Sequence, residues 1–202
     1  MKRNNISNSM PDHLKTALRN SIKQVRSKIS VPYRVKSSNQ ICNRIRVLEE
    51  YRKAKSIAMY FAINGEVDLI SLWHSAPLQG KFCYFPVLNQ NSTLSFLPAT
   101  PKTPFKNNRY GIPEPDVSRD LAIPIEQLDL IIIPLVAFDP YCTRLGMGSG
   151  YYDRTLVNKK NCLFLGVAYQ FQKVNFLIPE PWDVPLDAVV TQKAVYWRFP
   201  QI

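Results

Sequence analysis

The chain has 202 residues, of which 46% are hydrophobic, so it is long enough to bury one good core and too short for two large domains. Its longest apolar run, residues 130–138, is interrupted by Pro134 and falls short of the roughly 18 residues that a membrane-spanning helix needs, so we expect no membrane partner. The formal net charge of +11 excludes an acidic protein and raises the question of an anionic partner such as nucleic acid.

The positive charge is concentrated near the amino terminus. Residues 1–55 contain 14 Lys+Arg against 3 Asp+Glu, whereas residues 56–202 contain 12 of each. A basic segment on a neutral body suits an anionic ligand such as a polyphosphate, and it also suits weak RNA binding without sequence preference. The charge alone leaves both alternatives open.

The first residues carry charges without an apolar segment behind them, so we expect no secretory signal and a cytoplasmic protein. We expect residues 1–12 to be disordered, residues 13–202 to form a single domain, and the protein to be a monomer. The cysteines stand far apart without a Cys-x-x-Cys pair, which favours buried, reduced thiols over a metal site. They are Cys42, Cys83, Cys142 and Cys162.

Helical periodicity begins near the amino terminus. An apolar stripe predicts a helix of about four turns, at Leu14, Leu18, Ile22, Val25 and Ile29. Beside it, Lys15, Arg19 and Lys23 follow at intervals of four and form a cationic ridge at the edge of the buried face. Pro32 fits the start of a second helix, which ends near Arg52, so we predict an N-terminal helical hairpin.

Further along, continuous apolar runs rich in branched residues predict strands that are buried on both faces. These runs are 56–63, 128–133, 163–169 and 188–191. Helices are predicted at 68–74 and 151–157, and the proline-rich region 77–124 is expected to hold a hairpin and long loops. The fold class is therefore α/β, a single domain with a mostly parallel central sheet flanked by helices.

A glycine-rich segment, 144–153, follows the predicted strand 128–133 and precedes a predicted helix. Ligands of α/β sheets bind beyond the carboxyl ends of the strands, and amides at a helix start donate to phosphate oxygens. Arg144 can contact phosphate through its guanidinium, and Asp153 offers the oxygen ligand that Mg²⁺ prefers. Taken alone, the same residues also fit a tight glycine turn with a surface Arg–Asp pair.

The segment fits none of the common catalytic loops. It lacks the Gly-Lys-Ser/Thr ending of a Walker A loop, the spacing of a dinucleotide-binding loop, and the register of a Gly-x-Ser-x-Gly elbow. His74, Trp182 and Trp197 have no partner suggested by spacing, and we assign them to packing.

The letters RLGMGSGYYDR (144–154) resemble the nucleotide loop of the 5-formyltetrahydrofolate cyclo-ligases, also called 5,10-methenyltetrahydrofolate synthetases. Four other segments resemble that family and occur in its order, namely KTALR (15–19), YFAINGEVDL (60–69), RYGIPEP (109–115) and EPWDVPLDAVVT (180–191). The resemblance extends over residues 15–191, and five ordered motifs are far more specific than one glycine loop.

The resemblance implies an enzyme that joins ATP and 5-formyltetrahydrofolate to give 5,10-methenyltetrahydrofolate, ADP and phosphate through a phosphorylated formyl group, an iminium phosphate. It implies that Lys15, Arg19 and Arg144 supply the catalytic cations, and that Asp153 and Asp187 hold Mg²⁺. The ATP-binding set it implies is Lys15, Arg19, Arg144, Leu145, Gly146, Met147, Gly148, Ser149, Gly150, Tyr151 and Tyr152. The folate-binding set is Phe61, Glu66, Met147, Gly148, Ser149, Gly150 and Tyr151.

Two residues depart from the family pattern. Cys142 stands where the family usually has a glycine, and Leu69 stands where a threonine is common. Two other functions remain to be weighed against the cyclo-ligase, namely a basic nucleic-acid-binding module and an ATP-dependent enzyme of the same fold that acts on a non-folate substrate. No RNA- or DNA-reading motif supports the first of these.

Overall fold

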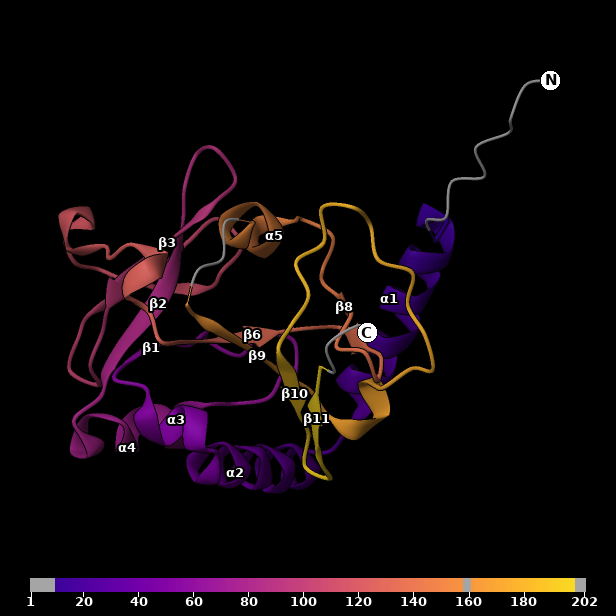
Figure 1. Cartoon of the computed structure of the whole chain (residues 1–202), viewed down its shortest axis with the longest axis horizontal. Coiled ribbons are helices and arrows are strands. Elements are labelled where there is room, and N and C mark those ends of the chain that lie inside the picture. Colours follow the sequence, from indigo (N-terminus) through magenta and orange to yellow (C-terminus); the bar gives the residue numbers. More distant parts are fainter. Residues whose placement is uncertain (1–9, 158–160, 199–202) are drawn as a thin grey trace.

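The structure is a computed structural model that describes residues 10–157 and 161–198. Within these residues, seven strands form one sheet in the order β11-β10-β9-β6-β1-β2-β3 (Figure 1). The strands are β1 (Ser56–Ala58), β2 (Phe82–Leu88), β3 (Leu94–Pro98), β6 (Leu130–Pro134), β9 (Leu163–Val167), β10 (Ala188–Val190) and β11 (Val195–Trp197). The five central strands are parallel and only the two edge strands are antiparallel, so the predicted α/β class is confirmed.

Both faces of the sheet are covered. The helices α2 (Val31–Val47), α3 (Glu49–Lys53) and α4 (Ile70–Ser75) lie on one face, and α5 (Tyr151–Leu156) lies on the other (Figure 1). Residues of β6 alternate between the two cores, since Ile132 packs with Ile41 and Leu72 while Ile131 and Ile133 pack on the α5 side. This two-sided burial explains why the strand reads as an uninterrupted apolar run.

The N-terminal helices are present, but they do not form the predicted hairpin. Helix α1 (Asp12–Lys28) and α2 diverge at Ser30, and α1 runs along the end of the sheet (Figure 1). The inward face of α1 agrees with the predicted stripe only in part. Ile22 is buried as predicted, but Leu14 and Val25 are 49% and 44% exposed, and Lys15 and Arg26 are buried instead. The surface under α1 offers carbonyl and carboxylate oxygens, which long cations satisfy and leucine does not.

The central region holds the predicted hairpin, β2–β3, and a second short one formed by β4 (Phe105–Asn107) and β5 (Pro113–Pro115). Another short pair, β7 (Ala137–Phe138) and β8 (Arg144–Leu145), precedes the glycine-rich segment. Four 3₁₀ turns complete the described elements, at Pro77–Gln79, Arg119–Leu121, Ile125–Gln127 and Gln170–Gln172. None of the described helices has both the length and the apolar character needed to cross a membrane.

The two strands that lead into the site end early. The run 56–63 forms a strand only to Ala58, after which the chain leaves the sheet, and β6 ends at Pro134 before the β7–β8 pair. Since β1 and β6 are parallel neighbours, the segments that follow them emerge at the same edge. The predicted disorder of residues 1–12 concerns mainly residues outside the described part; α1 begins at Asp12.

Candidate active site

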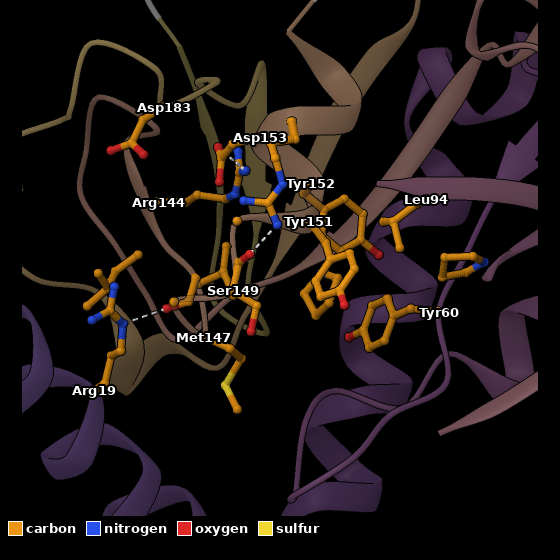
Figure 2. A pocket seen from close by; sticks show the side chains of 18 of the residues that line it. Arg19, Tyr60, Leu94, Arg144, Met147, Ser149, Tyr151, Tyr152, Asp153 and Asp183 are labelled. Carbon is orange, nitrogen blue, oxygen red and sulfur yellow. Dashed lines mark hydrogen bonds and ion pairs between the residues drawn. The ribbon is translucent and has the colours of Figure 1, made fainter. Parts of the chain in front are cut away.

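A cavity of about 1020 Å³ opens at the carboxyl edge of the parallel strands (Figure 2). Its walls come from α1, the segment that follows β1, the second hairpin, the glycine-rich segment and the turn 180–183. Nearly all of the predicted site residues line it, although they come from three separate parts of the sequence, 15–19, 61–66 and 144–153. The lining residues among them are Lys15, Arg19, Phe61, Glu66, Arg144, Leu145, Gly146, Met147, Gly148, Ser149, Gly150, Tyr151, Tyr152 and Asp153.

Helix α1 contacts the glycine-rich segment directly. Nε of Arg19 donates a hydrogen bond to the carbonyl oxygen of Gly146 at 2.9 Å (Figure 2). A Cβ atom at Gly148 would lie 3.5 Å from Cζ of Arg19, so the loop and the guanidinium are in van der Waals contact. One turn earlier, Lys15 forms an ion pair with Glu180. Two residues of the cationic ridge, Lys15 and Arg19, therefore face the cavity.

The glycine-rich segment has a backbone that side chains other than glycine rarely adopt. The φ angles of Gly148 and Gly150 are +104° and +66°. Arg154, which also lines the cavity, braces the loop, because it donates to the carbonyl oxygens of Ser149 (2.5 Å) and Ser92 (2.9 Å). Gly146 differs from both, since a Cβ atom there would meet no protein atom within 4 Å.

Arg144 and Asp153 form a largely buried clamp and are not the surface pair considered above. The side chain of Arg144 is 5% exposed, and its Nη2 lies 2.5 Å from Oδ1 of Asp153. Its Nη1 donates to the carbonyl oxygen of Val184, whose amide donates back to Oδ1 of Asp153 at 3.1 Å. The guanidinium is thereby fixed in orientation at the cavity wall, as an electrostatic catalyst must be.

The structure does not bring the two predicted metal ligands together. Asp187 precedes β10 and accepts a hydrogen bond from the amide of Phe164 at the start of β9, the opposite end of the strands from the cavity. Asp183 lines the cavity with Asp153, and Figure 2 shows the two carboxylates near Arg144. Burial raises the pKa of Asp183, and the charge of Asp153 acts in the same direction. Asp183, and not Asp187, is therefore the carboxylate that lines the cavity together with Asp153.

The other end of the cavity is aromatic and holds one buried carboxylate. Phe61 stacks on Phe85 with ring centroids 4.5 Å apart. Oε2 of Glu66 accepts from the amide of Ile63 at 3.2 Å, and the Glu66 side chain is 7% exposed. Burial raises the pKa of Glu66, and the positive charge of Arg26 opposes that shift. A carboxylate here suits a ligand with N–H donors.

Several lining residues were missed from the sequence. The second hairpin contributes Asn108, Tyr110 and Ile112. Its segment 109–115 resembles a family motif, but the sequence predicted no ligand contact for it. Trp182, which spacing assigned to packing, lines the cavity and is 66% exposed. The hairpin also touches the glycine loop, since Nη2 of Arg109 donates to the Tyr151 hydroxyl at 2.6 Å.

Cys142 adopts the backbone conformation that the glycine usual at this position would favour. Its φ angle is +62°, and its thiol is fully buried and donates to the carbonyl oxygen of Tyr196 at 3.2 Å. Burial raises the pKa of this thiol to about 12. The substitution therefore keeps the turn that leads into the glycine loop and fills the space beneath it.

The thiols are expected to be unreactive in the folded protein, because all four cysteines are free and buried and burial raises the pKa of Cys42, Cys83 and Cys142. Ellman's reagent at pH 8 should release little chromophore from the native protein and four equivalents after denaturation in guanidinium chloride. Fast release from the native protein, at the rate of a free thiol, would contradict this prediction.

The fold and the cavity define an α/β protein whose sheet edge holds a glycine-rich, cation-lined ligand site. The family model of the 5-formyltetrahydrofolate cyclo-ligase family matches residues 11–192. A 5-formyltetrahydrofolate cyclo-ligase of Haemophilus influenzae is 40% identical over 173 residues, which cover 84% of this chain and 92% of that protein. The enzyme of the same name from Escherichia coli K12 is 36% identical, over 87% of this chain and 98% of that protein. The chain belongs to the 5-formyltetrahydrofolate cyclo-ligase family.

Solved structures agree with this assignment. The 5,10-methenyltetrahydrofolate synthetase of Aquifex aeolicus superposes with a TM-score of 0.82 at 34% identity, covering 94% of this chain and 95% of that chain. The 5,10-methenyltetrahydrofolate synthetase of Mycoplasma pneumoniae gives a TM-score of 0.72 at 28% identity, covering 88% and 98%. The resemblance on which the sequence prediction was based is confirmed.

Proposed function

We propose that this protein uses ATP to convert 5-formyltetrahydrofolate to 5,10-methenyltetrahydrofolate, with release of ADP and phosphate. The observation that carries the proposal is the convergence of Arg19, Arg144 and the glycine-rich segment on one cavity whose other end holds Glu66. Family membership supplies the reaction, and this geometry supplies separate places for an anionic and a ring-shaped ligand.

The phosphates would occupy the end lined by Lys15, Arg19 and Arg144. The open space at Gly146 lets a phosphate approach the main chain closely. Lys15 is paired with Glu180, so nucleotide binding would add to or replace that ion pair. The fixed guanidinium of Arg144 suits the charge that develops on a transferring phosphoryl group.

We further infer that Asp153 and Asp183 hold the Mg²⁺ ion of Mg-ATP. Both residues line the cavity, and among the described residues Oδ2 of Asp153 and Oδ1 of Asp183 accept no hydrogen bond from the protein, so one oxygen of each carboxylate is left for the ion. Two carboxylates suit this ion, because Mg²⁺ usually takes one or two protein oxygens and completes its shell with phosphates and water. The ion would neutralise charge on the phosphate oxygens.

The folate ring would occupy the aromatic end. Glu66 would accept hydrogen bonds from the amino and ring N–H groups of the pterin, and Phe61 is presented by its contacts with Trp73 and Phe85 to pack against the ring. Met147 and Tyr151 line the middle of the cavity, where the formyl group and the γ-phosphate would meet.

The chemistry requires ATP because a formyl oxygen is a poor leaving group. Transfer of the γ-phosphoryl group to that oxygen would give an iminium phosphate, which the second folate nitrogen attacks before phosphate leaves. The nucleophiles belong to the substrate, so the protein contributes alignment and positive charge and forms no covalent intermediate. The direct test is an assay with 5-formyltetrahydrofolate and Mg-ATP, in which growth of the methenyl absorbance must depend on both substrates.

Gly146→Ala separates ligand contact from folding. The added methyl group meets no protein atom, so the free energy of unfolding should change by less than about 0.5 kcal/mol. It projects into the space assigned to phosphate, so the KM for ATP should rise about tenfold or more. Gly80→Ala is a control with the opposite expected effects. Gly80 lies at an exposed turn that does not line the cavity, and its φ angle is +69°, so the substitution should lower the free energy of unfolding by about 1 kcal/mol and leave the kinetics unchanged. An unchanged KM for ATP in Gly146→Ala would show that the phosphates do not bind at this loop.

The remaining expectations are that the protein acts as a monomer in the cytoplasm on small molecules. Buried free thiols support a reducing compartment. Lys15 and Arg26 are buried, which withdraws part of the N-terminal charge from any nucleic-acid surface. Light scattering coupled to gel filtration tests the monomer, and a thermal shift with Mg-ATP but none with RNA would reject the nucleic-acid-binding alternative.

A further inference from the structure

Arg26 is a buried cation to which the mechanism above assigns no role. It projects from α1 two turns beyond Arg19 and is 1% exposed. Its Nε donates to the carbonyl oxygen of Asn64 at 2.9 Å, but Nη1 and Nη2 have no hydrogen-bond partner among the described residues. Burying a guanidinium with two unsatisfied nitrogens is unfavourable unless a nearby charge or a ligand compensates.

The nearby charge is Glu66. Nη1 of Arg26 lies 3.8 Å from Oε1 of Glu66, which is within ion-pair range but longer than a hydrogen bond. The turn between them is held tightly against α1, because Gly65 has a φ angle of +73° and a Cβ atom there would lie 3.2 Å from the carbonyl oxygen of Arg26. The Tyr169 hydroxyl donates to the carbonyl oxygen of Glu66 at 3.1 Å, so the main chain is fixed from a second side.

The other groups near this carboxylate are two buried phenols and, on the far side of the turn, a second arginine. Tyr60, after β1, and Tyr152, on α5, face Glu66, and burial keeps both phenols neutral by raising their pKa values. Figure 2 shows the two rings side by side at this end of the cavity. Arg34, on α2, approaches the same turn from the far side, where its Nη1 would lie 3.8 Å from a Cβ atom at Gly65. Arg26 is thus the cation whose field opposes the effect of burial on Glu66.

We propose that Arg26 is a positioning residue that keeps Glu66 ionised and aimed into the cavity, so that Glu66 can accept hydrogen bonds from the N–H groups of the bound ring. This inference rests on the proposed folate-binding function. When the substrate binds, the Glu66 carboxylate accepts hydrogen bonds from the N–H groups of the ring. Arg26 does not contact the substrate, and its positive charge stabilises the negative charge of Glu66 from the side away from the cavity. The arrangement is specific for a ring that presents N–H donors and selects against a ring that presents only acceptors.

The test compares Arg26→Gln with Arg26→Lys and with the matched control Arg34→Gln. The first removes the charge, the second keeps it, and the third removes a neighbouring charge that forms no ion pair with Glu66 among the described residues. Michaelis constants for 5-formyltetrahydrofolate and for ATP are measured from pH 5.5 to 9. Carboxyl carbon NMR of protein labelled at glutamate follows Glu66 itself, assigned by its loss in Glu66→Gln.

The sign follows from the charge. Arg26 lowers the pKa of Glu66, so its removal raises that pKa, and binding that needs the carboxylate is lost at a higher pH. Arg26→Gln should raise the KM for the folate about tenfold at neutral pH, shift its pH profile upward, and leave the KM for ATP within twofold. Arg26→Lys should restore most of the loss, and Arg34→Gln should match the wild type. In a Glu66→Gln background, Arg26→Gln should add nothing.

Three results would overturn the inference: an NMR titration of Glu66 that Arg26→Gln does not move, equal increases in both Michaelis constants, or additive effects in the double variant. If Arg26→Gln does not fold and Arg26→Gln/Glu66→Gln does not fold either, Arg26 is structural and the inference fails. The NMR titration needs no turnover, so an inactive wild type would reject the proposed function while the coupling of Arg26 to Glu66 is still measured.

Discussion

Arg144→Met is expected to lower ATP-dependent turnover by about 10³-fold or more, because it removes the one cation that the protein holds rigidly against both Asp153 and the main chain of Val184. Lys15 and Arg19 reach the cavity on long side chains from α1 and cannot replace a guanidinium that is fixed in orientation. Arg144→Lys keeps the positive charge but loses the planar guanidinium with its two parallel N–H donors, so it should recover only part of the rate. The measurement is methenyl formation under saturating substrates.

Arg144→Met also leaves Asp153 without its partner, so the stability of the variant must be measured beside its activity. The pair is 5% and 22% exposed, and breaking it should cost up to about 3 kcal/mol. Arg144→Met/Asp153→Asn should recover stability without recovering turnover. Arg119→Met is the control, since Arg119 is exposed and bonds only to the β2 end. Turnover near that of the wild type in Arg144→Met, with the fold intact, would place the phosphoryl-transfer site elsewhere.

Gly166→Val is expected to prevent folding, and Gly166→Ala to lower the free energy of unfolding by about 1–3 kcal/mol. Gly166 lies in the middle of β9, where a Cβ atom would lie 2.5 Å from Leu186, 2.9 Å from Leu135 and 3.1 Å from Val189. These side chains are nearly or fully buried, so little space exists into which they can move. The Gly80→Ala variant, strained but uncrowded, should lose less.

Urea unfolding followed by circular dichroism measures both glycine variants, and the midpoint gives the ranking even if the slope changes. A midpoint equal to that of the wild type in Gly166→Ala would contradict the prediction, because it would mean that Leu135 and Leu186 leave enough space for a methyl group beside β9. The ligand-binding edge lies at the end of this strand, so activity should fall only in proportion to the unfolded fraction.

Patterns that depend on neighbours in sequence predicted the fold well. The runs around Ile131 and Leu165 are buried on both faces, so composition alone identified β6 and β9 as central parallel strands. The strand 56–63 was predicted too long, because Tyr60, Phe61 and Ile63 are apolar for a different reason: they line the cavity. The edge strand β11 was missed, since its short, half-exposed sequence carries no periodic signal.

The site was predictable only as far as chemistry is local. The sequence of the glycine-rich segment was enough to place it at the cavity, whereas Asp183 and Asp187 are four residues apart and only the three-dimensional register of β10 separates them. The apolar stripe of α1 was predicted correctly at Ile22 but not at Val25, since part of the buried face meets oxygens and so selects Arg26 over Val25. A buried arginine has no signature in sequence, because its partners are supplied by the remainder of the fold.

The hydrogen bond between Arg19 and Gly146 joins positions 127 residues apart. During synthesis, the amino-terminal half of the proposed nucleotide site therefore leaves the ribosome long before its counterpart exists, and a nascent chain cut before β8 lacks the glycine-rich segment that α1 contacts. If ATP binds where we propose, it clamps the first helix to the last third of the chain, so Mg-ATP should raise the midpoint of global unfolding and protect α1 from proteases.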